Sequence, residues 1–426
     1  MTILSPISEV GCGCGTLDDQ TSLLTIDEAL AQIVRGVTPI TEIESVELAH
    51  ARGRLLAKPV CARSAVPPFD NSAMDGYAIS AASLTGAGPW HLAVTARIAA
   101  GQGEPASVTF GTAAQIFTGA PIPQGADAVV MQEDVQRVDG MIVVSKKVEP
   151  GTHVRFAGED MGAGETIVPA GRQLTARDIG ACAAAGSETV CVRRRVRVAL
   201  LVTGDEVRRP GFSGNRAGIW DVNTSMLSAA ISSNGAELVH VEIGQDDRKA
   251  LRTQLSRLAE RADLVVTTGG ISVGEEDHVK PALADLGATI VFSGVAMKPG
   301  KPISFGRVKQ AHWLGLPGNP LSAFITWHLF GTVLGRVLAG GNPTSGIRRH
   351  VVLSHPLHHR PGRCELRLAE LSGFDGAGRE SVHFADATHS GRVARLPDAD
   401  GVILIPAEVE TLPAGALVEF QPFCDR

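Results

Sequence analysis

Four short loops in the second half of the chain combine carboxylates, lysines and turn-forming glycines. They are Thr203–Glu206, Thr268–Gly274, Met297–Pro302 and Gly315–Pro320. Three of them follow a short apolar run directly, and the Lys-Pro-Gly-Lys loop comes a few residues after another such run. Loops at the carboxyl ends of parallel strands open on one edge of a sheet, where ligands bind. The mixture of groups predicts a site for an anionic ligand that is handled together with a divalent metal.

Each loop also has an ordinary explanation when it is taken alone. The Thr203–Glu206 turn fits a polar turn before a helix, and Asn319 before a proline fits simple helix capping. Lys298 and Lys301 flank a proline-glycine pair, which suits a preorganised cationic site and a solvated turn equally well. Asp277 follows the second loop, so backbone donors for phosphate oxygens and a carboxylate for Mg²⁺ occur together there.

The elements that must position these loops alternate between strand and helix over residues 191–341. We expect strands at 196–202, 236–243, 263–267 and 288–293, and helices from about 223, over 247–261 and 279–286, and from 319. Strands that alternate with helices indicate an α/β domain with a mostly parallel sheet.

The regions on either side have a different pattern. Residues 63–157 and 342–426 contain short apolar strands separated by turn residues, which predicts two β-domains. Helices are expected from Thr25, where Glu28 gives capping-box spacing, and over Thr175–Ala185. The first β-region therefore resembles an insertion into a small helical or mixed domain.

Composition limits the class of protein. The 426 residues suggest roughly two to four domains. A net charge of −6, from 39 basic and 45 acidic residues, gives no indication of nucleic-acid or membrane-surface binding. The apolar runs look shorter than a membrane span and no secretory signal is visible, so we expect a cytoplasmic protein. Cys12 and Cys14 lack partners with zinc-ligand spacing, and no dinucleotide or P-loop motif follows a strand.

Taken in order, the motifs resemble the molybdopterin molybdenumtransferase family of MoeA type, also present as the E domain of gephyrin. Any one match is weak, but eight in chain order over residues 25–420 are specific. The matches are Asp70–Ala78, Thr118–Pro121, Gly125–Val130, Arg155 with Gly158–Asp160, Thr203–Glu206, Gly269-Gly270 with Ser272–Gly274, Met297–Pro302 and Gly315–Pro320.

The resemblance implies a multidomain architecture and a reaction. After a mobile leader (1–20) come a discontinuous domain I (21–62 plus 158–190), an inserted β-domain II (63–157), a MogA-like α/β domain III (191–341) and a C-terminal β-barrel domain IV (342–426). Adenylated molybdopterin and molybdate would give molybdenum cofactor and AMP, with Mg²⁺ as cofactor. A homodimer would share each active site between the α/β domain of one subunit and the β-insert of the other.

The resemblance also assigns roles to individual residues. Glu206, Asp246 and Asp277 would handle metal and phosphate, and Asp75, Thr118 and Asp160 would reach the reaction from the insert. The residues implied in substrate binding are Lys298, Lys301, Pro299, Pro302, Arg367 and Ser390 for molybdate, and Gly269, Gly270, Ser272, Gly318 and Asn319 for the pterin phosphate.

One departure and two alternatives stay open. Val222 stands where the family usually has the serine of Asp-Ser-Asn, which alters one expected ligand contact. The α/β domain alone would also suit a molybdopterin adenylyltransferase, and a gephyrin-like scaffold would need no catalysis. Molybdate and tungstate, both tetrahedral dianions, are not distinguished, and maturation proteins that would receive the product are not identified.

Overall fold

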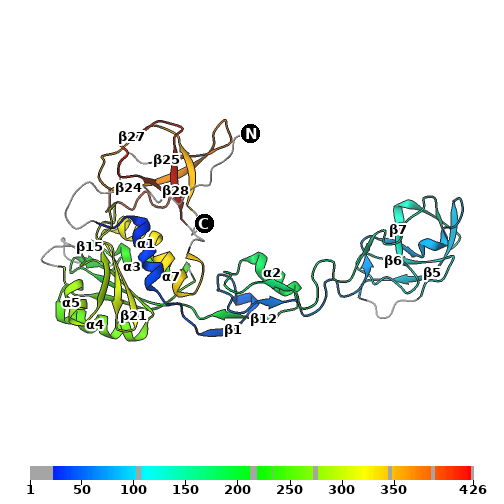
Figure 1. The fold of residues 1–426 in the computed structure, drawn as a ribbon, viewed down its shortest axis with the longest axis horizontal. Coiled ribbons are helices and arrows are strands. Elements are labelled where there is room, and N and C mark those ends of the chain that lie inside the picture. The colour runs from blue at the N-terminus through cyan, green and yellow to red at the C-terminus, as the bar shows by residue number, and fades with distance from the viewer. Residues whose placement is uncertain are drawn as a thin grey trace. The chain divides into compact units, whose positions relative to one another are not determined.

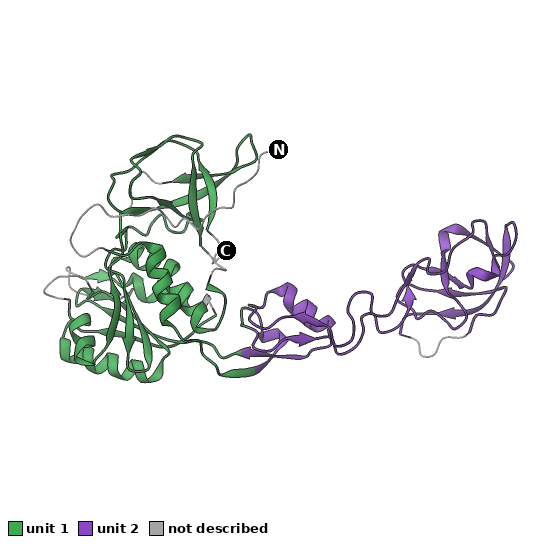
Figure 2. Ribbon diagram, viewed as in Figure 1, with its two compact units in different colours: residues 1–44, 53–55, 193–426 green, residues 45–52, 56–192 purple. Residues whose placement is uncertain are grey.

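The computed structural model describes residues 23–101, 107–211, 218–233, 235–271, 277–343, 348–384 and 389–423. The chain forms two compact units, coloured separately in Figure 2. Unit 1 comprises residues 1–44, 53–55 and 193–426, and unit 2 comprises residues 45–52 and 56–192. The leader expected at residues 1–20 and the predicted site residue Ser272 lie outside the described residues.

The main sheet of unit 1 has six strands in the order β16-β13-β17-β21-β20-β18. Their bounds are β13 Arg197–Thr203, β16 Glu237–Gly244, β17 Leu264–Thr268, β18 Thr289–Ser293, β20 Ser304–Val308 and β21 Ala311–Leu316. Strands β16, β13, β17 and β21 are parallel, whereas β20 pairs antiparallel with β21 and β18. The mostly parallel sheet predicted from the alternating pattern is therefore confirmed.

Both faces of this sheet are covered by helices, which explains why the five residues 198–202 of β13 are all apolar. Val198, Leu200 and Val202 belong to one buried cluster, and Ala199 and Leu201 belong to another. Figure 1 shows α4 and α5 on one side of the sheet. The helices of the second cluster are α4 Arg248–Arg261 and α5 Val279–Asp285, and those of the first are α1 Ile26–Gly36, α3 Val222–Ser233, α6 Pro320–Thr326 and α7 Thr332–Leu338.

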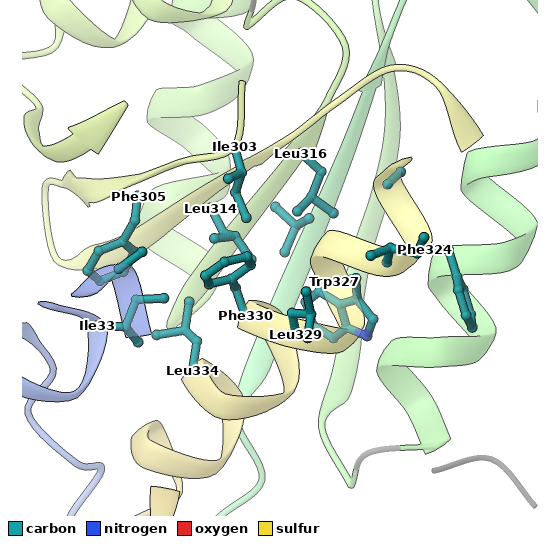
Figure 3. Close-up of a cluster of buried hydrophobic side chains, with 14 of the residues drawn as sticks. Ile33, Ile303, Phe305, Leu314, Leu316, Phe324, Trp327, Leu329, Phe330 and Leu334 are labelled. Carbon is teal, nitrogen blue, oxygen red and sulfur yellow. The ribbon is translucent and has the colours of Figure 1, made fainter. Parts of the chain in front are cut away.

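A π-helical segment, η4 Trp327–Gly331, joins α6 and α7 into one buried helix (Figure 3). A Cβ on Gly331 would lie 2.2 Å from the Trp327 ring, so the close packing of this ring requires glycine. The helix Pro320–Leu338 has 19 residues with a mean hydropathy of 1.3, long and apolar enough to span a membrane by length and composition. The expectation that apolar runs are too short is wrong here, but 78% of this window is buried in the core of unit 1.

Helix α1 packs in the core of unit 1, although the residues that follow it in the chain form unit 2. Thr25 and Glu28 form the predicted capping box, with Glu28 N–H donating to Thr25 Oγ1 over 3.2 Å. Ile26, Ala29 and Ile33 are fully buried in the cluster that also contains Leu334. The four domain boundaries stay predictions, but the apolar stripe of α1 finds its burial against the α/β core.

Five strands close into a barrel at the C-terminal end of unit 1. They follow the order β24-β25-β22-β28-β26, and β26 pairs back to β24. Strand β19 (Met297–Lys298), which carries part of the Lys-Pro-Gly-Lys loop, pairs parallel with β24. The predicted C-terminal β-barrel is confirmed, and its strands are β22 Arg349–Leu353, β24 Cys364–Phe374, β25 Glu380–Phe384, β26 Gly401–Ile405 and β28 Leu417–Pro422, with the short pair β23 Leu357–His358 and β27 Thr411–Leu412 outside the ring.

Unit 2 contains a six-stranded sheet of its own, in the order β7-β4-β6-β5-β9-β8. The 3-10 helix η3 (Gln132–Asp134) separates β7 from β8. The elements of this sheet are β4 Gly76–Ile79, β5 Trp90–Ile98, β6 Thr112–Ile116, β7 Ala128–Met131, β8 Val135–Val138 and β9 Met141–Val144. The rest of the unit contains helix α2 Ala176–Ala184 and the short strands β2 Val60–Cys61, β3 Asn71–Ser72, β10 Val154–Arg155, β11 Thr166–Val168 and β12 Thr189–Arg193.

Candidate active site

The carboxyl ends of four parallel strands lie in register at one edge of the sheet in unit 1. Thr203 at the end of β13 is paired with Gly244 of β16, and Thr268 of β17 is paired with Leu316 of β21. Val202 is in turn paired with Thr268. The loops that follow these residues therefore start side by side, as the sequence predicts for three of the four loops.

Two acidic loops at this edge are joined by reciprocal hydrogen bonds. The Asp205 N–H donates to Asp246 Oδ2 over 3.1 Å, and the Asp246 N–H donates to Asp205 Oδ1 over 3.2 Å. Burial raises the pKa of Asp246, and the charges of Asp205 and Glu206 add to the shift, while His278 opposes it. The structure thus brings Glu206 and Asp246 together and adds Asp205, which the sequence contained in the motif but did not single out.

Asp277 precedes helix α5, next to His278 in the chain. Burial lowers the pKa of Lys280 on the first turn of this helix, and the Asp277 charge partly offsets that shift. Among the described residues, no three His, Cys, Asp or Glu side chains form a group that could hold a metal ion by themselves. The three predicted metal residues Glu206, Asp246 and Asp277 are therefore not a preassembled ligand set.

Gly269 and Gly270 make the tight turn that follows β17. Their φ values of +90° and +62° are in the region that favours glycine. A Cβ on Gly269 would lie 2.7 Å from Thr203 Oγ1, and one on Gly270 would lie 2.9 Å from a methyl of Val279. Both glycines are required by the backbone, and the turn lies close to the end of β13. The Gly269 N–H donates to the Leu316 carbonyl over 3.2 Å, which joins this turn to the end of β21.

Asn223 connects two of the loops, and sequence reasoning did not assign it a role. Its Nδ2 donates to Thr268 Oγ1 over 2.9 Å and to the Gly318 carbonyl over 2.7 Å. Thr268 Oγ1 donates to the Pro317 carbonyl over 2.9 Å. The sequence signal for Asn223 was its position in the Asp-Val-Asn segment. In the structure, Asp221 of this segment accepts the Thr224 N–H at the start of α3.

Lys298 and Arg367, predicted as oxyanion residues far apart in the sequence, meet at the same carboxylate. Lys298 Nζ lies 4.0 Å from Glu365 Oε1, and Arg367 Nε donates to this oxygen over 3.2 Å. Arg367 also donates to the His358 carbonyl over 2.6 Å. Glu365 and Arg367 are each only 4% exposed, whereas Lys298 is exposed at the surface.

The other predicted oxyanion and phosphate residues are distributed around the start of α6. The Ser390 carbonyl accepts the Leu321 N–H over 3.1 Å, so this segment contacts the helix that begins after Asn319. A Cβ on Gly391 would lie 4.0 Å from Asn319 Oδ1, and one on Gly318 would lie 3.4 Å from Gly269. Lys301 is exposed, Pro299 between the two lysines is buried, and Pro302 after Lys301 is half-buried.

The predicted residues of the insert lie in unit 2. Asp75 accepts two hydrogen bonds from Thr118, one from its N–H and one from its hydroxyl, both at 2.8 Å. These bonds lower the pKa of Asp75, which is exposed. Asp160 is also exposed, and its N–H donates to the Val66 carbonyl over 3.0 Å. Asp70 accepts the Ala157 N–H over 2.8 Å and so joins the segments that carry Asp75 and Asp160.

The whole chain shows the architecture of a class of proteins that bind molybdopterin. Three family models match in succession: "MoeA N-terminal region (domain I and II)" over residues 24–186, "Probable molybdopterin binding domain" over 199–336, and "MoeA C-terminal region (domain IV)" over 350–423. The similarity to curated relatives extends over most of the chain, and the chain belongs to the molybdopterin molybdenumtransferase family.

Two relatives and one solved protein illustrate the similarity. Molybdopterin molybdenumtransferase 2 of Mycobacterium tuberculosis is 34% identical over 398 residues, covering 92% of this chain and 96% of the relative. Molybdopterin molybdenumtransferase of Nostoc sp. is 36% identical over 376 residues, covering 86% and 85%. A crystal structure of the molybdopterin biosynthesis MoeA protein from Pyrococcus horikosii superposes with a TM-score of 0.78 at 30% identity, covering 95% of this chain and all of that chain.

Proposed function

We propose that this protein inserts molybdenum into molybdopterin. In the proposed reaction molybdate reacts with adenylated molybdopterin, the phosphoanhydride is cleaved, and molybdenum cofactor and AMP are released with the help of Mg²⁺. The observation that carries the proposal is the identity of 34% over almost the whole chain to a relative named molybdopterin molybdenumtransferase. The alignment of acidic, glycine and asparagine loops at one sheet edge supports it, because such an edge suits a phosphorylated ligand.

The acidic loops fit a magnesium ion that is shared with the substrate. Mg²⁺ usually takes one or two carboxylates, with waters and substrate phosphates as its other ligands. The raised pKa of Asp246, caused by burial and by Asp205 and Glu206, is the electrostatic condition that a bound cation would relieve. We assign Asp246, Glu206 and Asp277 as the residues that would hold the Mg²⁺ ion. The ion would neutralise charge that develops on the phosphate oxygens.

The remaining residues bind and orient the two anionic substrates. Gly270 would offer its N–H to the pterin phosphate, and Gly269, Gly318 and Asn319 would border the phosphate at the same turn. Lys298 and Arg367 provide positive charge for molybdate, with Lys301 on the same loop, and charged donors of this kind suit a tetrahedral dianion. No proton transfer is needed to hold either anion.

We further propose a homodimer in which the insert of a second copy completes each site. Three large apolar side chains in unit 2, Phe69, Met74 and Phe156, are 45%, 40% and 52% exposed. Met74 precedes Asp75, and Phe69 precedes Asp70, which accepts a hydrogen bond next to Phe156. Exposed apolar side chains grouped around polar site residues are typical of protein interfaces. A cytoplasmic location and transfer of the product to maturation proteins are part of the same proposal.

Release of AMP from purified protein tests the function directly. Adenylated molybdopterin would be supplied with Mg²⁺, with and without molybdate, and AMP and pterin-bound molybdenum would be measured together. We expect AMP release that depends on molybdate, with the metal retained on the pterin. ATP-dependent formation of the adenylate would instead identify an adenylyltransferase, and tight binding without release would identify a scaffold. Repeating the assay with tungstate sets the metal preference.

A further inference from the structure

We infer that Glu365 is a positioning residue that holds Lys298 and Arg367 as a fixed pair of cations for the oxyanion. The inference deepens the proposed function and rests on it. Glu365 was not among the residues that the sequence singled out, and it is not assigned a contact with the reacting atoms. It acts through the two cations that its carboxylate joins.

The backbone places Lys298 and Glu365 next to each other. Strand β19 pairs parallel with the start of β24, with Met297 in register with Cys364 and Lys298 in register with Glu365. The Cys364 N–H donates to the Ala296 carbonyl over 3.1 Å and begins this pairing. Side chains in register on neighbouring strands project to the same face of a sheet. The loop of the α/β domain is therefore fastened to the barrel at the lysine itself.

The alternation along β24 separates its two faces. Leu366 and Cys364 belong to the buried cluster shared with the α/β core, whereas Ala369 belongs to the cluster inside the barrel. Glu365 and Arg367 have the same parity as Ala369, so their charged side chains project to the barrel side of the strand. A carboxylate and a guanidinium that are each 4% exposed need charged partners to be stable there.

The partners of the Glu365 carboxylate are three basic side chains. Oε1 lies 3.2 Å from Arg367 Nε and 4.0 Å from Lys298 Nζ, and Oε2 lies 3.5 Å from His359 Nε2. His359 is itself fixed, because its Nδ1 donates to the Val409 carbonyl over 2.7 Å. The negative charge of Glu365 is thus contacted by three basic side chains. Two of them, Arg367 and His359, are held in place by hydrogen bonds to backbone carbonyls.

This arrangement solves a specific problem for lysine as an anion ligand. A lysine side chain has four carbons and free rotamers, so ordering it costs conformational entropy when the anion arrives. The Glu365 carboxylate orders Lys298 beforehand and cancels only one of the two fixed positive charges of Lys298 and Arg367. The pair keeps a net positive charge that a dianion can use. The exposed ammonium group of Lys298 remains open to solvent on its other side.

The test is a double-mutant cycle on the molybdate dependence of AMP release. Glu365→Gln keeps the size of the side chain and removes its charge, and we expect the KM for molybdate to rise about tenfold or more with kcat changed less than about threefold. In the Lys298→Met background the same substitution should raise KM by a clearly smaller factor, because only the part of its effect that passes through Arg367 remains. Glu370→Gln, an exposed carboxylate on the same strand, is the matched control and should behave as wild type.

Equal effects of Glu365→Gln in both backgrounds, or an unchanged KM in the first, would overturn the inference and leave the proposed function standing. If the Gln variant does not fold, Glu365→Asp is used in the same cycle, because it withdraws the charge from both cations by one carbon. If wild type releases no AMP, the proposed function fails. Tungstate binding is then measured by calorimetry on the same four proteins. A larger loss of affinity from Glu365→Gln when Lys298 is present than in the Lys298→Met variant supports the positioning role, and an equal loss in both rejects it.

Discussion

Asp246 carries the electrostatic signature of a cation site, because burial and two neighbouring carboxylates raise its pKa. A group whose pKa is raised on folding favours stability at low pH and loses that contribution as the pH rises through the folded-state value. A bound cation favours the charged form, so Mg²⁺ affinity should increase as the pH rises through this same window, which lies above the ordinary range of aspartate.

Asp246→Asn should therefore weaken Mg²⁺ binding by about tenfold and flatten the pH dependence of that binding above the ordinary pKa range of aspartate. Without Mg²⁺ at neutral pH the variant should melt at a higher temperature than wild type, because the buried charge has been removed. Calorimetric titrations at several pH values and thermal melts measure both effects. Glu237→Gln, at the opposite end of β16, is the control, and an unchanged Mg²⁺ affinity of the Asn variant would exclude Asp246 as a ligand.

Asp75 illustrates the opposite shift, since the two hydrogen bonds from Thr118 lower its pKa. A lowered pKa means that the charge is kept at neutral pH and that its contribution to stability is lost only as the pH falls through the folded-state value. Thr118→Val removes one of the two donors and should raise the pKa of Asp75 in an NMR titration. Asp75→Asn should reduce AMP release by about 100-fold with little change in melting temperature, because the side chain is exposed. Retained activity in the Asn variant would remove Asp75 from the proposed site.

At the scale of elements, the turn after β17 depends on two glycines. Gly269→Ala would place a Cβ 2.7 Å from Thr203 Oγ1 at a φ of +90°, which should destabilise the protein by about 1–3 kcal/mol and weaken adenylate binding. Gly335→Ala in α7 meets no atom within 4 Å and should be neutral or slightly stabilising. Chemical denaturation and binding of adenylated molybdopterin compare the two variants. Equal behaviour of both would show that the turn tolerates a side chain.

Helix α1 supplies the second prediction at this scale. Ile33 is fully buried against the α/β core, so Ile33→Ala should lower the free energy of unfolding of unit 1 by about 2–5 kcal/mol. Ile43→Ala, at a side chain that is 46% exposed, is the matched control and should cost much less. Fluorescence of the buried Trp313 and Trp327 reports the unfolding of unit 1. A small effect at Ile33 would contradict the packing of α1 described above.

Local patterns predicted the elements of unit 1 well, because alternating periodicity reports burial directly. The helix expected over 247–261 is α4 (Arg248–Arg261), and the strand expected over 263–267 is β17 (Leu264–Thr268). Contacts between distant segments left no such signal. The pairing of β19 with β24 joins residues more than sixty positions apart, so the shared carboxylate of Glu365 could not be predicted. Asn223 was likewise missed, because its partners follow two other strands.

At the scale of the whole molecule, the open question is how many copies form one working enzyme. Phe156→Ser in unit 2 should shift the protein from dimer towards monomer, because it removes an exposed apolar side chain from the proposed interface. AMP release should fall with the dimer fraction and recover at high protein concentration. Phe374→Ser, at a side chain that is 74% exposed in unit 1, is the control. Sedimentation analysis measures both, and a monomeric wild type would reject the shared site.

The position of α1 has a consequence for how the chain is made. This helix is synthesised before the rest of its core, and the α7 residues that cover it, such as Leu334, leave the ribosome about 300 residues later. At about 5–20 residues per second, that gap lasts about 15–60 seconds, during which unit 2 can already fold as a separate unit. The apolar stripe of α1 must remain uncovered or be held by a chaperone throughout. Nascent chains stalled before α7 should therefore bind chaperones through residues 26–36, and chains stalled after the barrel should not.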